Sequence, residues 1–111
     1  MKDRLYILKA PFQDGGFEWY CNDCATLESA LLYNPHWKAK IDVHHVDFPR
    51  PRRELIELLG RDDWQGLPML VMDKDRAPGD AIMVGEFAIL QDVRAIGRAL
   101  TSRHGGVGPH P

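Results

Sequence analysis

The feature that most constrains this chain is the order of its short apolar segments. The segment RLYILKA (4–10) is rich in β-branched and aromatic residues, and it precedes a helical segment at 21–33. A second strand-like segment, KIDVHHVDF (40–48), follows. Strand, helix and strand in this order form a crossover between parallel strands. The sequence therefore predicts an α/β fold.

The rest of the chain extends this pattern. The segment PRPRRELIELLG (49–60) begins with prolines and closes on glycine, which is typical of a short helix. Two strands are predicted at 67–73 and 81–85, joined by a turn, and a final helix at 86–105. The predicted order is β-α-β-α-β-β-α, a four-stranded mixed sheet with helices on both faces. The short connection between 67–73 and 81–85 predicts that these two strands form a hairpin.

Length and composition indicate one globular domain. The chain has 111 residues, 44% apolar and 27% charged, and we expect a domain at 1–104 followed by a disordered C-terminal tail at 105–111. A net charge of −2 gives no reason to expect nucleic acid as a partner. No apolar run approaches the roughly 20 residues that span a bilayer, and none resembles a secretory signal, so a cytoplasmic protein without membrane contact is predicted.

The only two cysteines, Cys21 and Cys24, stand at the start of the first helix. Structural disulfides are rare in the cytoplasm, so a close pair indicates redox activity or metal binding. One helical turn brings such a pair within disulfide range, and the helix N-terminus stabilises a thiolate. Cys24 shares a face with Leu27 and Leu31 and should be buried. We expect Cys21 to be exposed and to attack, and Cys24 to resolve the mixed disulfide.

Other interpretations of the pair stay open. Asp23 lies between the two cysteines, and its negative charge raises the pKa of a neighbouring thiol. The pair could therefore be two packed helix residues in a non-catalytic binding or adaptor module. A metal site would need two further ligands, and His44 and His45 are adjacent on a strand, so they face opposite sides of the sheet. We predict no metal site in one chain, although two chains could pool their cysteines.

Three sequence features together resemble the thioredoxin-like superfamily: the CNDC motif, the GLPMLV strand and the VGEFAIL segment before the last helix. The resemblance covers about residues 4–103 and is closest to glutaredoxins and the N-terminal domain of glutathione transferases. The chain is also similar to a bacterial family of small thioredoxin-like proteins known as a domain of unknown function. The resemblance implies a thiol–disulfide oxidoreductase without a cofactor, acting on a protein or low-molecular-weight thiol or disulfide. It also implies a cis Pro68 facing the cysteines, with the backbone of Leu67 pairing with the substrate.

The chain departs from these relatives at two places. Asn22 and Asp23 separate the cysteines, where glutaredoxins and thioredoxins usually have proline or glycine. Gly85 and Glu86 are expected at the start of the last helix, where related proteins hold the γ-glutamyl carboxylate of glutathione. A carboxylate there would compete with that group, so glutathione binding of the family type is not expected. Transferase activity is not expected either, because a second helical domain is missing.

Four further residues are candidates for substrate binding. Trp19 and Tyr20 could form an apolar platform beside the thiols, or they could simply cover the loop. Lys9 resembles a lysine that some glutaredoxins have near the active thiol, although a solvated strand end is the alternative. Arg52, in a cluster with Arg50 and Arg53, could bind a carboxylate or phosphate, although a solvated surface cluster is the alternative. The oligomeric state is not predicted.

Overall fold

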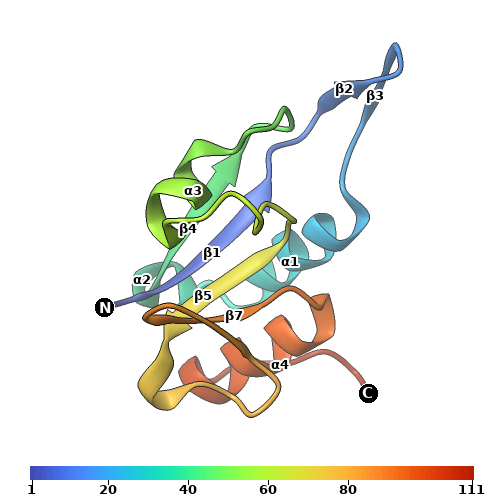
Figure 1. Cartoon of the computed structure of the whole chain (residues 1–111). Coiled ribbons are helices and arrows are strands. Elements are labelled where there is room, and N and C mark those ends of the chain that lie inside the picture. The colour runs from blue at the N-terminus through green and yellow to red at the C-terminus, as the bar shows by residue number, and fades with distance from the viewer.

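The computed structural model describes all 111 residues and contains a five-stranded mixed sheet in the order β4-β1-β5-β7-β6 (Figure 1). Its strands are β1 (Asp3–Leu8), β4 (Ile41–Val46), β5 (Met69–Asp73), β6 (Ile82–Val84) and β7 (Phe87–Leu90). β4 runs parallel to β1, and the other pairs are antiparallel. The α/β class and the parallel crossover between the first two predicted strands are confirmed.

Helices cover both faces of this sheet, as predicted (Figure 1). They are α1 (Asn22–Tyr33), the short α2 (Trp37–Lys40), α3 (Arg53–Leu59), the 3-10 turn η1 (Lys74–Arg76) and α4 (Val93–His104). Successive side chains of β1 point to opposite faces. Leu5 and Ile7 pack with residues of α1 and α4, whereas Tyr6 packs with Leu55 of α3.

The final helix is shorter than predicted, and the last two predicted elements are rearranged. Residues 87–90 form β7, which pairs with β5, and α4 begins only after Asp92, whose side chain accepts a hydrogen bond from the Ala95 amide at 2.9 Å. The predicted hairpin between 67–73 and 81–85 is wrong, because β6 pairs with β7 instead. The prediction of four strands is wrong for the same reason, since it counted β7 as helix.

The segment before Cys21 contains a hairpin that the sequence analysis did not predict. β2 (Phe12–Asp14) pairs with β3 (Phe17–Trp19) in a separate two-stranded sheet. Gly15 and Gly16 connect the strands with positive φ values of 61° and 83°, a conformation that favours glycine and a tight hairpin turn. We call β2, β3 and this turn the arm, because it projects away from the rest of the protein (Figure 1).

The C-terminal segment packs against the protein, in contrast to the expectation of a disordered tail at 105–111. The buried side chain of Asn34 accepts a hydrogen bond from the Val107 amide at 2.8 Å and donates one to the Val107 carbonyl at 3.1 Å. The indole of Trp37 donates to the Gly105 carbonyl at 2.8 Å. Pro109 lies against Gly97 of α4. Residues 105–109 thus cover the junction between α1 and α4.

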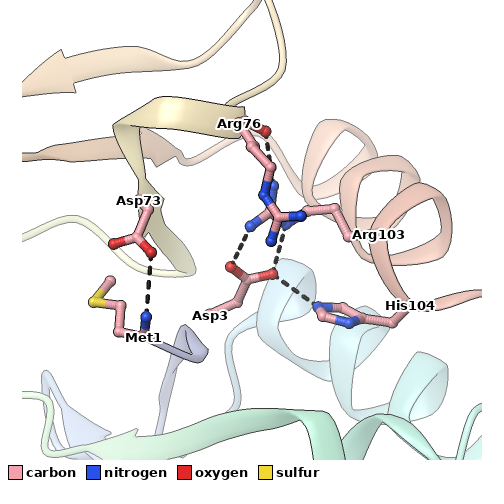
Figure 2. Close-up of polar contacts among 6 residues, drawn as sticks. All are labelled: Met1, Asp3, Asp73, Arg76, Arg103 and His104. Carbon is pink, nitrogen blue, oxygen red and sulfur yellow. Dashed lines mark hydrogen bonds and ion pairs between the residues drawn. The ribbon is translucent and has the colours of Figure 1, made fainter.

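A buried ion-pair network joins the start of β1 to the end of α4 (Figure 2). Both carboxylate oxygens of Asp3 accept hydrogen bonds from the Arg103 guanidinium at 2.7 Å, and His104 Nε2 lies 2.8 Å from the same carboxylate. Arg103 also donates to the Arg76 carbonyl at 2.8 Å. Burial raises the pKa of Asp3, but the hydrogen bonds and positive charges of its partners outweigh this effect and lower the pKa overall.

None of the helices has the length and apolar character needed to cross a membrane.

Candidate functional site

The candidate residues converge because several chain segments meet at one edge of the sheet. The pairings Leu8 with Val46, Tyr6 with Met69 and Leu70 with Leu90 place the C-terminal ends of β1, β4 and β7 beside the first residue of β5. The loops that follow or precede these strand ends carry most of the predicted site residues. This edge of the sheet is where we place the candidate site.

Cys21 caps the N-terminus of α1. Its backbone is extended (φ −78°, ψ 121°), and its Sγ accepts a hydrogen bond from the Cys24 amide at 3.3 Å. The sulfur therefore occupies the place that a serine or aspartate oxygen takes in an ordinary N-cap. It receives the partial positive charge of the helix terminus and remains partly exposed. The prediction that Cys21 is the more exposed cysteine is confirmed.

Cys24 lies behind Cys21 and is buried, as predicted, at 2% exposure beside Leu27. Its Sγ accepts a hydrogen bond from the Leu8 amide at 3.3 Å, which fixes it at the end of β1. Burial raises the pKa of the Cys24 thiol to about 12, together with its hydrogen bond to Cys21 and the nearby charges of Cys21 and Asp23. Neither cysteine forms a disulfide in this structure.

Leu67 and Pro68 precede β5 at the same edge. The peptide bond between them is cis, as the resemblance implies, and Pro68 is buried. The Leu67 side chain packs against the same hydrophobic cluster as Cys21. The backbone N–H and C=O groups of Leu67 form no hydrogen bond with other backbone groups, so they are free to pair with an extended chain.

The three arginines of the predicted cluster differ in their environments. Arg50 and Arg53 are exposed, whereas Arg52 is buried at 5% exposure. The Arg52 guanidinium donates to the Gln65 carbonyl at 2.6 Å and to the Phe48 carbonyl at 2.8 Å, and it lies 5.9 Å from the centre of the Phe48 ring. Arg52 thus connects the loop after β4 to the loop before β5.

The other predicted substrate-binding residues lie on the arm and at its base. Lys9 is exposed just after β1, and its amide donates to the Val46 carbonyl at 2.8 Å. Trp19, 51% exposed, donates its indole N–H to the Asp14 carbonyl at 2.8 Å across the arm. Tyr20 is 67% exposed immediately before Cys21. Trp19 and Tyr20 therefore present exposed rings next to the cysteine pair in the sequence.

Gly85 and Glu86 are not at the start of the last helix, which corrects the prediction. They form the turn between β6 and β7, where exposed Glu86 makes an ion pair with Lys74 at 3.1 Å. The residue at the helix start is Asp92, because the preceding segment is a strand. The carboxylate expected to compete with the γ-glutamyl group of glutathione at this helix start is therefore that of Asp92, not that of Glu86.

Three residues of the site edge were missed by the sequence analysis: Phe48, Gln65 and Gln91. Phe48 stacks on Phe12 at the base of the arm with ring centroids 4.5 Å apart. The Gln65 carboxamide accepts a hydrogen bond from the Arg52 amide at 2.7 Å, and Gln91 donates to the Gly66 carbonyl at 3.1 Å. An aromatic residue and two amides in loops carry no sequence signal, because their role depends on contacts between distant segments.

The largest surface hollow lies elsewhere. It has a volume of about 670 Å³ between α1 and β4, is open to solvent, and contains none of the candidate residues. Its polar lining includes Glu28 and His45, whose side chains are 3.2 Å apart. The cysteine pair is therefore not part of this hollow.

These observations define the class of the molecule: an α/β protein with a cysteine pair at the N-terminus of a helix and a cis proline at the same sheet edge. The chain belongs to the family described as Protein of unknown function (DUF3088), whose sequence profile matches residues 2–108. No curated protein and no solved structure matches the chain.

Proposed function

We propose that this protein is a thiol–disulfide oxidoreductase with a thioredoxin-like fold, in which Cys21 attacks and Cys24 resolves. The observation that carries the proposal is the partly exposed Cys21 sulfur at the N-cap of α1, with the buried Cys24 thiol directly behind it. A helix N-terminus favours the thiolate, which is the nucleophile in disulfide exchange.

The arrangement of elements supports the thioredoxin-like fold. Without β6, the arm and the shortest helices, the order is β-α-β-α-β-β-α, the order predicted from the sequence, but with β7 in place of the strand predicted at 81–85. The strand that begins next to the cysteines is β5, and it follows a cis proline. The extra strand β6 lies at the far edge of the sheet and does not interrupt the site.

The proposed reaction transfers two electrons from the cysteine pair to a substrate disulfide. The Cys21 thiolate attacks one substrate sulfur, a mixed disulfide forms, and the first substrate thiolate leaves. Cys24 then gives its proton to the first substrate thiolate and attacks the Cys21 sulfur. This attack releases the second substrate thiolate and leaves a Cys21–Cys24 disulfide. A low-molecular-weight thiol or dithiol must reduce this disulfide before the next cycle.

The raised pKa of Cys24 fits the order of these steps. Burial keeps this thiol protonated, with a pKa of about 12, so it does not compete with Cys21 for the substrate. The hydrogen bond and the charge of Cys21 are further causes of the raised pKa. The negative charge and the hydrogen bond of Cys21 are both lost when Cys21 is bonded to a substrate sulfur. The pKa of Cys24 should therefore fall in the mixed disulfide, at the step in which Cys24 attacks.

Exposed aromatic side chains on the arm favour a protein or peptide substrate. Phe17 and Trp19, 68% and 51% exposed, contact each other edge to face on β3 with ring centroids 6.1 Å apart, and Tyr20, 67% exposed, comes immediately before Cys21. Aromatic side chains supply large contact areas at protein interfaces. The free backbone groups of Leu67 can bind an extended segment of the same partner by strand addition.

Reduction of insulin disulfides by the purified protein, with dithiothreitol as reductant, tests the proposal. The unchanged protein should accelerate reduction, and Cys21→Ser should reduce the rate to that of dithiothreitol alone. Cys24→Ser should instead accumulate a mixed disulfide on Cys21, seen by mass spectrometry as a mass increase of one substrate thiol. A Cys21→Ser variant as active as the unchanged protein would contradict the proposal.

A non-catalytic binding module is the second candidate. Asn22 and Asp23 favour it, because they separate the cysteines where glutaredoxins and thioredoxins usually have proline or glycine. This candidate predicts that Cys21 reacts with iodoacetamide no faster than a free model thiol at neutral pH. A faster reaction that saturates with rising pH would exclude it.

A further inference from the structure

The Arg52 side chain is a buried cation without a carboxylate partner. Both of its terminal nitrogens donate to backbone carbonyls, of Gln65 and Phe48, and it takes part in no ion pair. Its Nε is the one buried side-chain nitrogen or oxygen in the protein that lacks a hydrogen-bond partner. Burying a charge with only neutral partners is unfavourable, so a nearby anion would stabilise this arrangement.

The contacts of Arg52 place it at the same edge of the sheet as the cysteine pair. Phe48, which lies under the guanidinium, packs against the same hydrophobic cluster as Cys21 and Leu67. Gln65, which binds Arg52 through both its side chain and its carbonyl, is two residues before Leu67. The guanidinium therefore lies between the loop after β4 and the loop that carries the cis proline.

The charged groups around Arg52 agree with this placement. Burial is the main cause of the lowered pKa of Arg52, and the positive charge of Arg50 adds to it. Cys24, Glu54 and Cys21 act in the opposite direction. Glu54 is exposed and forms no ion pair with Arg52, so solvent weakens its effect. Asp47 and Asp62 lie on the two loops that contact Arg52, but both are exposed, so solvent weakens their effect in the same way. Cys24 is buried and Cys21 is half-buried, so a negative charge on either sulfur is less screened.

We propose that Arg52 is the counter-charge for the thiolate of the cysteine pair. Its fixed positive charge lowers the free energy of the sulfur anion that forms at Cys21 and then at Cys24 during exchange. Arg52 acts through the cysteines and is a positioning residue. The inference rests on the proposed function, since the thiolate is the nucleophile of that reaction. The pKa of the thiol can nevertheless be measured without any catalytic turnover.

The test compares the pH dependence of Cys21 alkylation by iodoacetamide, together with thiolate absorbance at 240 nm, in a set of variants. Arg52→Gln and Arg52→Met both remove the charge, the first with a polar side chain and the second with an apolar one. We expect each to slow alkylation at pH 7 about tenfold, which corresponds to a one-unit rise in the pKa of the thiol. Arg52→Lys keeps the charge and should stay within about threefold of the unchanged protein by the same relation.

Exposed Arg50→Gln and Arg53→Gln are matched controls that remove the same charge from the same segment, and they should change the rate by less than about twofold. A merely structural role predicts a different pattern. Arg52→Lys would then lower the urea unfolding midpoint as much as Arg52→Gln does, and neither would change the thiol titration. Folded neutral variants with unchanged titration would overturn the inference.

The outcomes for Arg52 and for the proposed function are separable. If the unchanged protein reduces disulfides while the neutral variants keep its thiol titration, the inference fails and the function stands. If the unchanged protein does not reduce disulfides but the neutral variants still raise the thiol pKa, the function fails and the counter-charge stands.

Discussion

At the scale of single residues, the buried polar groups divide into those with a charged partner and those without one. Asp3, at 3% exposure, has two partners on α4: its carboxylate accepts two hydrogen bonds from Arg103 and lies 2.8 Å from His104 Nε2 (Figure 2). Arg52 has only carbonyl partners. Removing one partner of a buried ion pair is costly, so the Asp3 network should matter for stability, whereas the role of Arg52 is the one proposed above for the cysteine pair.

The Asp3 network predicts a loss of stability in acid. The pKa of Asp3 is lowered in the folded protein, whereas it is about 3.9 in the unfolded chain. The stabilisation is therefore fully present above that value and is lost as pH falls through the folded pKa. Asp3→Asn should lower the free energy of unfolding by about 3 kcal/mol near neutral pH.

Urea unfolding of Asp3→Asn and the unchanged protein between pH 7 and pH 2 measures this effect. The difference between the two proteins should shrink toward the acid end of the range. Asp42→Asn, at an exposed position of β4, is the control and should show little effect at any pH. A constant difference between Asp3→Asn and the unchanged protein down to pH 2 would contradict the proposed linkage.

The sequence identified Cys21 and Cys24 correctly in position and relative exposure. Cys24 is buried because it shares a helix face with Leu27 and Leu31, whereas Cys21 precedes the helix as its N-cap and stays partly exposed. It could not separate Arg52 from Arg50 and Arg53. Which arginine is buried depends on carbonyl groups of Phe48 and Gln65, in loops whose paths are set by tertiary packing.

At the scale of elements, residues 105–109 of the C-terminal segment, which we call the clasp, connect α1 to α4. Removal of residues 105–111 would leave buried Asn34 and Trp37 without their partners Val107 and Gly105. We expect a loss of about 2 kcal/mol, because buried polar groups that lose their partners are costly. This corresponds to a decrease in Tm of roughly 10 °C for a domain of this size.

Thermal unfolding of two truncated proteins tests the clasp. A chain ending at His104 should show the full decrease, whereas a chain ending at Pro109 keeps every hydrogen bond of the clasp and should match the full-length protein. Equal Tm values for all three chains would show that the clasp adds nothing to stability.

The elements that the sequence analysis missed have identifiable physical causes. The segment FAILQDVRAIGRAL has apolar spacing that fits a helix throughout. The sequence analysis therefore predicted one helix over residues that form both β7 and α4. Short apolar runs are ambiguous by periodicity, and the decisive signal was the N-cap residue Asp92 before the regular helical pattern. The arm had a signal too, since Asp-Gly-Gly between aromatic residues is a typical hairpin turn.

At the scale of the whole molecule, the two faces of the sheet are covered unequally. One face carries α1 and α4 over a cluster of 16 buried residues, and the other carries α3 over a cluster of 7. Leu55 is the one α3 residue in the smaller cluster that is fully buried. The smaller face therefore depends strongly on this side chain.

Leu55→Ala should lower the free energy of unfolding by about 3 kcal/mol, because it leaves a cavity under α3. Leu58→Ala, at a partly exposed position of the same helix, should cost about 1 kcal/mol. Urea unfolding followed by circular dichroism and by fluorescence should give one midpoint for each variant if the protein is a single cooperative unit. Equal losses for the two variants would contradict the unequal coverage.

The fold class and the crossover were predictable because they follow from periodicity and segment order. The order of the last strands in the sheet could not be predicted from the sequence. It depends on whether β5 pairs with the strand that follows it in the chain or with the next one, and tertiary packing decides this. In the structure β7 takes the position next to β5, and β6 becomes the outer strand.

The arm has a consequence for how such a protein can diversify. Its base is held where Phe12 stacks on Phe48, while its tip extends free of the body (Figure 1). The Cys21 sulfur is held separately, by its hydrogen bond from the Cys24 amide at the N-cap of α1, so we expect that changes at the tip of the arm leave it in place. Under the proposed function, selectivity for a partner and reactivity toward it would belong to separate segments, which evolution or an engineer could change independently.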